Sequence, residues 1–457
     1  MSTGLLAYAS YLPRYRLSGE DVGLRRGDRV VASYDEDSTT MAVAAAMNAM
    51  PHGTVPAAIY FATSTPAYAD KTNATAVHAA LGLPATVFAA DMCGTGRSAF
   101  AALSAAAQHG GLMLAADVRV GRPGSADEKL GGDGAVALLF GEGDPVAEYL
   151  ASYSLTEEFL DRWRGPHASV GGQWEERFGS ERYTPLIRAA SEGALGAADI
   201  ADADHVVLAC PNTAVVKRAA TLVKGQKSVT TSPVGFSGSA DAFIGLCGVL
   251  DTAQPGDTIL ILSATDGCDA VVLRATDRLP QARQLVPLSN QRAKGLALPY
   301  LRYLSARNLV EIEPPRRPEP DRAAAPPAAR TRQWKFGFSG SKCPSCDFVH
   351  FPPARVCRGC GFSGEMSAVS AAHLSGTVVT YTVDRLAFSP SPAFSPSPPM
   401  VQVVVDVDGG GRCTLELADA RSEELEVGAR VNFTFRRLFT AAGIHDYFWK
   451  AVLTHGQ

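Results

Sequence analysis

The sequence lacks any long apolar run and any large excess of one charge. No apolar stretch reaches the ~18 residues that a membrane-spanning helix needs, and the first residues lack the pattern of a signal peptide. Lys and Arg number 42 against 46 Asp and Glu, for a net charge of −4. A nucleic-acid binder would show a basic stripe. We therefore expect a cytoplasmic protein that crosses no membrane and binds no nucleic acid.

Close cysteine pairs are also scarce, since five of the nine cysteines have no near neighbour of their kind. These are Cys93, Cys210, Cys247, Cys268 and Cys413. In a reducing compartment they would remain thiols.

The other four cysteines form one motif, "CPSC" followed ten residues later by "CRGC". Each pair fits a tight turn on which both sulfurs converge, and four thiolates make the closed tetrahedral shell of structural zinc. A redox pair or chance is the alternative, which two pairs at this spacing disfavour. We predict one structural Zn²⁺ without a catalytic role, held by Cys343, Cys346, Cys357 and Cys360.

A length of 457 residues with 46% hydrophobic residues suggests about three units of roughly 150 residues. Residues 1 to about 275 alternate apolar runs such as "AAIYFAT" (57–63) with Ala-rich runs such as "NATAVHAALG" (73–82). Non-alternating strands separated by helices indicate a layered α/β fold. The pattern occurs twice, which predicts two related halves, 1–150 and 151–275.

The sequence changes character after residue 275. "LALPYLRYLSARNLVEIE" (296–313) predicts a helix, and the Pro-rich run 314–330 predicts an exposed, extended linker, so that 276–333 forms a connection. Short alternating strands with Gly turns then predict a small barrel, interrupted by a low-complexity, flexible loop at 389–399.

Cys93 has a chemically suggestive position among the scattered cysteines. The apolar strand "VFAAD" (87–91) leads to it, and a helix is predicted over 94–109. A thiol at a helix N-terminus feels the positive end of the helix dipole, which lowers its pKa, and free N–H groups there can hold an oxyanion. A small buried thiol is the alternative. These residues alone leave both readings open.

Residues 1 to about 275 resemble the thiolase superfamily, specifically its 3-hydroxy-3-methylglutaryl-CoA (HMG-CoA) synthase branch, with kinship to ketoacyl synthase III. "YDEDSTTMAVAAA" (34–46) resembles the D-x-D-S-x-T-M-A stretch of that branch, "LDRWRGP" (160–166) its D-x-W-R motif, and "GGDGAVALLFG" (131–141) the strand that closes the first half. The resemblance implies duplicated α-β-α-β-α layers. It also makes Cys93 the acyl-accepting nucleophile.

The same resemblance implies that three helper residues are replaced. The histidine of F-H-x-P-Y-x-K corresponds to Ala209, the asparagine of G-N-x-x-G-S to Phe236, and the early glutamate to Ser64. Lys217 lies one helical turn beyond the position of the family lysine and is a candidate replacement. The implied substrate-binding residues are Ser64, Ala209, Cys210, Asn212, Lys217 and Phe236.

These replacements have chemical consequences. Condensation needs a group that moves a proton and donors that stabilise an enolate, and neither Ala209 nor Phe236 supplies them. Acyl transfer to a thiolate needs only the nucleophile and an oxyanion hole. His167 and Asp266 are possible auxiliary catalytic groups, with surface solvation as the alternative for each.

The C-terminal residues 331–457 resemble the rubredoxin-like zinc ribbon and OB-fold module that accompanies thiolases and archaeal HMG-CoA synthases. The resemblance rests on "WKFGFSGSKCPSC" (334–346), the second cysteine pair and later strands such as "GTVVTYTV" (376–383). It implies a zinc ribbon over 334–366 and an OB-fold over 367–457. In related assemblies the module helps hold or pass CoA-bound substrates.

The sequence therefore predicts a transferase. It would form an acyl thioester on Cys93 from acyl-CoA or acyl carrier protein and pass the acyl group to carbon, oxygen or nitrogen in a specialised biosynthetic pathway. The alternative is a non-catalytic acyl-CoA-binding or scaffold subunit for a partner condensing enzyme. The thiolase resemblance also implies a homodimer formed through the first 275 residues.

Overall fold

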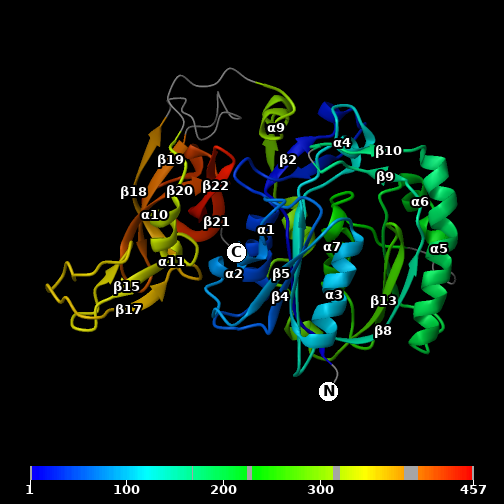
Figure 1. The fold of residues 1–457 in the computed structure, drawn as a ribbon, viewed down its shortest axis with the longest axis horizontal. Coiled ribbons are helices and arrows are strands. Elements are labelled where there is room, and N and C mark those ends of the chain that lie inside the picture. Colours follow the sequence, from blue (N-terminus) through cyan, green and yellow to red (C-terminus); the bar gives the residue numbers. More distant parts are fainter. Residues whose placement is uncertain (1–2, 167, 224–228, 312–319, 385–399, 455–457) are drawn as a thin grey trace. The chain divides into compact units, whose positions relative to one another are not determined.

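The computed structural model of the protein describes residues 3–166, 168–223, 229–311, 320–384 and 400–454 (Figure 1). It divides into two compact units. Unit 1 comprises Met1–Ala32, Asp37–Thr75 and Ala85–Pro299, and unit 2 comprises Ser33–Glu36, Ala76–Pro84 and Tyr300–Gln457.

The first half of unit 1 alternates strands with helices. Its main elements are β1 (Gly4–Tyr11), α1 (Ser38–Ala49), β4 (Ala58–Thr63), β5 (Phe88–Cys93), α3 (Arg97–His109), β6 (Gly111–Asp117) and β7 (Gly134–Gly141). Every residue of β6 is buried, which explains why its sequence is apolar throughout rather than alternating.

The second half repeats this order. Its elements are β8 (Ala147–Thr156), α5 (Glu176–Ala197), β11 (His205–Ala209), α7 (Asp241–Leu250), β12 (Thr258–Ser263) and β13 (Gly267–Ala275). The counterpart of β5 is reduced to one parallel bridge, between Val207 and Thr230. The predicted duplication is therefore confirmed, with a shorter sheet in the second half.

The strands form one nine-stranded sheet in the order β11-β12-β13-β8-β1-β7-β6-β4-β5. The halves meet at β1 and β8, through the single pair Leu5 and Ala147. Helix α1 packs on β1, β6 and β7, and α5 packs on β8, β12 and β13. Helices α3 and α7 lie between the halves, where the Phe100 and Phe243 rings are 5.1 Å apart (Figure 1). This is the expected α-β-α-β-α layering.

Shorter elements complete unit 1. They are β2 (Tyr15–Ser18), β3 (Asp28–Val31), α2 (Ala74–Ala80, which continues into unit 2), α4 (Ala126–Leu130), β9 (Arg162–Trp163), β10 (Gly172–Gln173), α6 (Thr213–Lys217), α8 (Leu288–Ala293) and β14 (Leu296–Leu298). Among the residues that the structure describes, no helix is both long and apolar enough to cross a membrane.

Unit 2 contains the zinc ribbon and the barrel. The ribbon sheet has the order β16-β15-β17, and the barrel closes in the order β18-β19-β20-β22-β21. Their elements are α9 (Tyr300–Ala306), α10 (Ala325–Arg330), α11 (Arg332–Lys335), β15 (Ser339–Lys342), β16 (Val349–His350), β17 (Ser367–Ser370), β18 (Ser375–Asp384), β19 (Met400–Val407), β20 (Arg412–Ala418), β21 (Arg430–Ala441) and β22 (Ile444–Leu453). Phe338, which precedes β15, stacks on Trp449 of the barrel with ring centroids 5.7 Å apart.

The connection between the units differs from the expectation. The predicted helix over 296–313 is wrong at both ends, because Leu296–Leu298 pairs with β2 as β14 and the helix begins only after Pro299. It ends where Asn308 takes a left-handed φ of 54° and the Leu309 N–H donates to the Leu304 carbonyl at 2.8 Å, the pattern of a Schellman stop.

The predicted extended linker over 314–330 is also wrong in part, because α10 occupies its C-terminal end. Its residues 314–319 and the predicted loop 389–399 lie outside the described residues.

Candidate active site and metal centre

Cys93 is the last residue of β5, the outermost strand of the sheet. Its parallel neighbour in register is Thr63, the last residue of β4. The thiol is thus at the carboxyl ends of parallel strands, where open α/β sheets bind their ligands. Cys93 is exposed.

The expected effect of the helix dipole on Cys93 is not found. Helix α3 begins at Arg97 rather than at residue 94, with Gly96 as its N-cap, so Cys93 lies outside the helix. Although Cys93 is exposed, the surrounding protein removes part of the water around its thiol, which raises the pKa, and the nearby carboxylates Asp91 and Asp117 raise it further. The expectation of a lowered pKa is therefore wrong, since Cys93 lies outside the first helical turn, where the dipole acts, and desolvation and two negative charges raise its pKa.

Asp117, at the end of β6, organises the neighbourhood of Cys93. It is fully buried. It accepts hydrogen bonds from the hydroxyls of Thr63, Ser64 and Thr65 at 2.8–2.9 Å, and from the N–H groups of Ser64, Thr65 and Ser239 at 2.6–3.0 Å. A buried carboxylate needs such partners. The network ties the end of β4 to the turn that precedes α7.

Two strand-to-helix turns, one from each half, meet here. A Cβ atom on Gly96 would lie 3.4 Å from the Gly238 carbonyl oxygen and 3.3 Å from Thr265 Oγ1. A Cβ atom on Gly238 would lie 2.1 Å from Asp117 Oδ2, and its φ is 62°. Glycine is required at Gly238 because no side chain fits both the space and the conformation.

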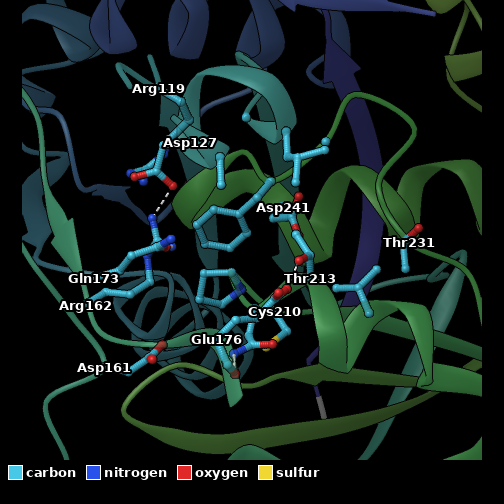
Figure 2. A pocket seen from close by; sticks show the side chains of 18 of the residues that line it. Arg119, Asp127, Asp161, Arg162, Gln173, Glu176, Cys210, Thr213, Thr231 and Asp241 are labelled. Carbon is cyan, nitrogen blue, oxygen red and sulfur yellow. Dashed lines mark hydrogen bonds and ion pairs between the residues drawn. The ribbon is translucent and has the colours of Figure 1, made fainter. Parts of the chain in front are cut away.

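A cavity of about 250 Å³ opens among α4, β9, β10, α6 and the segment 231–236 (Figure 2). Its apolar wall includes Trp174, Leu208 and Phe236. Its polar wall, labelled in Figure 2, includes Arg119, Asp127, Asp161, Arg162, Gln173, Glu176, Cys210, Thr213, Thr231 and Asp241.

Three of the residues expected from the sequence line this cavity, namely Cys210, Asn212 and Phe236. Asn212 caps α6 by accepting from the N–H groups of Ala214 and Val215. Burial raises the pKa of the Cys210 thiol, which keeps it protonated. Ala209 is buried at the end of β11.

The other expected residues lie elsewhere. Ser64 is buried beside Asp117 and reaches the cavity wall through Arg119, whose Nη1 donates to its Oγ at 3.3 Å. Lys217 is the exposed last residue of α6 and Asp266 is exposed in the turn before β13, and neither lines the cavity. His167 lies outside the described residues.

The sequence analysis missed Arg119, Arg164 and Asp241. Burial raises the pKa of Asp241 to about 7, although hydrogen bonds from Ser237 and the charge of Arg119 oppose the shift. Arg119 follows the buried strand β6 by two residues, and Arg164 belongs to the D-x-W-R motif. Arg119 could have been identified as a candidate site residue because it is a charged residue just beyond a buried strand.

The four paired cysteines converge in the zinc ribbon. Their sulfurs all lie within 4.8 Å of one another, with Cys343 and Cys360 at 3.7 Å and Cys346 and Cys357 at 3.5 Å. Tetrahedral zinc with Zn–S bonds of about 2.3 Å separates its sulfurs by about 3.8 Å. The donor set and spacing therefore fit Zn²⁺, as predicted.

We expect zinc removal to unfold the ribbon, because a structural zinc site supplies folding free energy directly. A chelator under denaturant-free conditions should release about one zinc per chain and make residues between the two cysteine pairs sensitive to protease. Metal analysis of freshly purified protein measures the stoichiometry. Protein that contains no zinc, or that holds another metal at full occupancy, contradicts this prediction.

Comparison with known proteins agrees with both parts of the structure. The family model of the ChsH2 rubredoxin-like zinc ribbon matches residues 337–367, and that of the ChsH2 C-terminal OB-fold matches residues 369–436. Hydroxymethylglutaryl-CoA synthase of Methanopyrus kandleri is 31% identical over 321 residues, which cover 62% of this chain and 91% of that protein. The Archaeoglobus fulgidus enzyme is 30% identical over 312 residues, with 60% and 90% covered. The chain belongs to the hydroxymethylglutaryl-CoA synthase family.

Solved structures share the fold of this family member at lower identity. MvaS in complex with 3-hydroxy-3-methylglutaryl coenzyme A is 16% identical with a TM-score of 0.60, covering 70% of this chain and 95% of that one. The curacin-pathway HMG synthase in complex with acetyl donor-ACP is 16% identical with a TM-score of 0.55, covering 67% and 88%. These likenesses establish the thiolase-like fold.

Proposed function

We propose that Cys93 accepts an acyl group from acyl-CoA or from an acyl carrier protein and passes it to a second substrate. The observation that carries the proposal is the position of an exposed cysteine at the carboxyl end of β5, in register with the end of β4, in a member of this family. Relatives of the fold bind a CoA thioester in one case and an acetyl donor on ACP in another, which supports both donors.

The first half-reaction is a thioester exchange. The Cys93 thiolate attacks the acyl carbonyl carbon, the bond from that carbon to the carrier sulfur breaks, and the carrier leaves as a thiol after taking up the proton that Cys93 lost. Detection of an acyl adduct on Cys93 by intact mass, after mixing with a panel of thioesters, tests this step.

The second half-reaction transfers the acyl group from Cys93 to the second substrate. The residues at the expected helper positions give it less support. Ala209 and Phe236 bring no hydrogen-bond donor and no titratable group. The cavity instead contains Asp241, whose pKa of about 7 suits proton transfer at neutral pH. The auxiliary role of Asp266 has little support because that side chain is exposed and does not line the cavity.

A second candidate function is a non-catalytic acyl-binding or scaffold subunit. The raised pKa of Cys93 favours it, because a thiol that stays protonated is a poor nucleophile. The mass experiment separates the two functions, since a scaffold binds thioesters without forming a covalent adduct. In either case the fused zinc ribbon and OB-fold would help to hold the substrate, at the high effective concentration that one chain provides.

We expect the reactivity of Cys93 to rise with pH. Because burial, Asp91 and Asp117 raise its pKa, the thiolate fraction stays small at neutral pH and grows only as pH increases. Alkylation by iodoacetamide, followed by peptide mass analysis, should have its midpoint above about pH 8.5, the ordinary value for cysteine. A midpoint below that value would show that an unidentified cation or base activates the thiol.

We also expect a homodimer formed through unit 1. Strand β5 ends the sheet, and Phe88 at its start is 61% exposed. An apolar edge strand presents unpaired backbone groups to which the same strand of a second copy can add. Light scattering at micromolar concentration should give twice the chain mass, and Phe88→Lys should shift the protein toward monomer. A stable wild-type monomer would contradict the prediction.

A further inference from the structure

Among the residues that the structure describes, the guanidinium of Arg119 makes no direct ion pair, although Asp117 and Asp127 attract its charge from farther away. It donates a 3.3 Å hydrogen bond to Ser64 Oγ and lies over the Phe236 ring, whose centroid is 5.3 Å from the guanidinium carbon. Within the described ranges no carboxylate lies at ion-pairing distance. The side chain lines the cavity, and burial lowers its pKa, as expected for a cation withdrawn from water.

A second guanidinium converges on the same residue. Arg164, in the loop after β9, donates through Nη2 to the Ser64 carbonyl oxygen and through Nη1 to the Ala168 carbonyl oxygen at 3.1 Å. Its positive charge repels that of Arg119 and helps to lower the pKa of Arg119. Arg164 likewise has no ion pair among the described residues, so two guanidiniums without a direct ion pair contact Ser64, one at its hydroxyl and one at its carbonyl oxygen.

Three of the neighbouring carboxylates have partners of their own. Asp117 accepts six hydrogen bonds from serine and threonine residues. Asp127 pairs with Arg162, as the dashed line in Figure 2 shows. Asp241 accepts from the N–H and the hydroxyl of Ser237 at 3.0 and 3.2 Å. None of these carboxylates accepts a hydrogen bond from the guanidinium of Arg119 in the described residues, so its remaining N–H groups are open to a ligand, while Asp117 and Asp127 offset part of its charge.

The ligand that fits is an oxyanion. A guanidinium presents a planar set of donors that matches a carboxylate or phosphate, and an unpaired charge in a partly dehydrated wall is unfavourable until an anion arrives. Ser64 directly follows Thr63, the register partner of Cys93. The Ser64 backbone therefore lies next to that of Cys93, and because Cys93 does not itself line the cavity, the acyl chain would extend from the end of β5 toward Arg119. The phosphates of CoA and of phosphopantetheine are separated from the thioester by the whole pantetheine arm.

We propose that Arg119 and Arg164 bind a carboxylate on the acyl group carried by Cys93, so that the substrate is a thioester of a dicarboxylic acid. The inference rests on the proposed acylation of Cys93 and specifies its substrate class. Arg119 should contribute most to binding the carboxylate because it lines the cavity. Arg164, which does not line it, should contribute less.

Acylation rates with paired thioesters test the proposal. Succinyl, glutaryl and adipyl thioesters of N-acetylcysteamine, which contain no phosphate, are compared with their ω-methyl esters on the full-length protein by quenched intact-mass analysis. The same acyl groups are then compared as CoA thioesters. For at least one chain length, we expect the free acid to react about tenfold faster or more than its methyl ester, the effect of one hydrogen bond to a charged group.

Substitutions of Arg119 and Arg164 test whether these residues cause the preference for the free acid over its methyl ester. Arg119→Gln should bring the acid-to-ester ratio close to one on both carriers, Arg119→Lys should retain part of it, and Arg164→Gln should reduce it less. Arg177→Gln is the matched control, because Arg177 is an exposed arginine on α5 that pairs with Glu181 at 2.9 Å and does not line the cavity. The thermal midpoint of each variant verifies folding.

The outcomes separate this inference from the proposed function. If Cys93 is acylated without preference for the acid, the inference is wrong and the acylation stands. If Arg119→Gln affects only the advantage of CoA over N-acetylcysteamine, the anion is a carrier phosphate and the dicarboxylate assignment is wrong. If no thioester labels Cys93, the proposed function fails and this inference fails with it.

Discussion

Cys93→Ser is expected to abolish the acyl adduct completely. A thiolate attacks thioesters readily, whereas a serine hydroxyl needs an adjacent base to become a nucleophile. The groups that act on the charge of Cys93 are the carboxylates Asp91 and Asp117, and Asp117 is occupied by its six hydrogen bonds. Adduct formation should therefore fall by at least about a thousandfold, to the detection limit of intact-mass analysis.

The variant should otherwise resemble the wild type. Cys93 is exposed, and exposed substitutions usually change the free energy of unfolding by no more than about 0.5 kcal/mol. Zinc content and thermal midpoint serve as controls, and peptide mapping of the wild-type adduct confirms its position. An adduct that persists in Cys93→Ser would move the nucleophile elsewhere. The absence of any adduct in the wild type, across a broad panel, would favour the scaffold function.

The second large effect is expected in carbon–carbon bond formation. The wild type should convert acetyl-CoA and acetoacetyl-CoA to HMG-CoA about 10²- to 10⁴-fold more slowly than the Methanopyrus kandleri relative, the usual contribution of a positioned acid–base group. The reason is the chemistry of Ser64, Ala209 and Phe236 at the helper positions. Ala209 and Phe236 cannot donate a hydrogen bond, and Ser64 is committed to Asp117 at 2.8 Å.

Parallel assays of both proteins, with HMG-CoA quantified by mass spectrometry, measure this difference. The yield of acetyl-Cys93 in the same samples is the control, because it separates slow condensation from failed acylation. Ordinary HMG-CoA synthase rates would show that the helper positions are wrongly aligned. His167 would then be the first residue to substitute, since it lies beside the D-x-W-R motif.

The sequence by itself determined the zinc site and the layered fold. Within each pair only two residues separate the cysteines, so tight turns bring their sulfurs together whatever the rest of the chain does. The buried strands could also be predicted from the sequence, because a strand covered on both faces, such as β6 or β12, is apolar at nearly every position. The same reasoning placed Cys93 at a strand end.

Only the tertiary structure decided the electrostatics of the candidate site. The pKa of Cys93 is raised rather than lowered because the packed chain withdraws the thiol from part of its water, and because Asp91 of its own strand and Asp117 of β6 add negative charge nearby. Arg119 and Arg164 meet at Ser64 although they are 55 and 100 residues from it in the chain. Helix 296–313 was cut short by pairing with β2, more than 270 residues earlier (for example, 281 residues separate Leu298 from Leu17). Charges and pairings of this kind act through space, so they depend on the packing of distant segments, whereas residue spacing within a turn or a strand is set locally by the backbone.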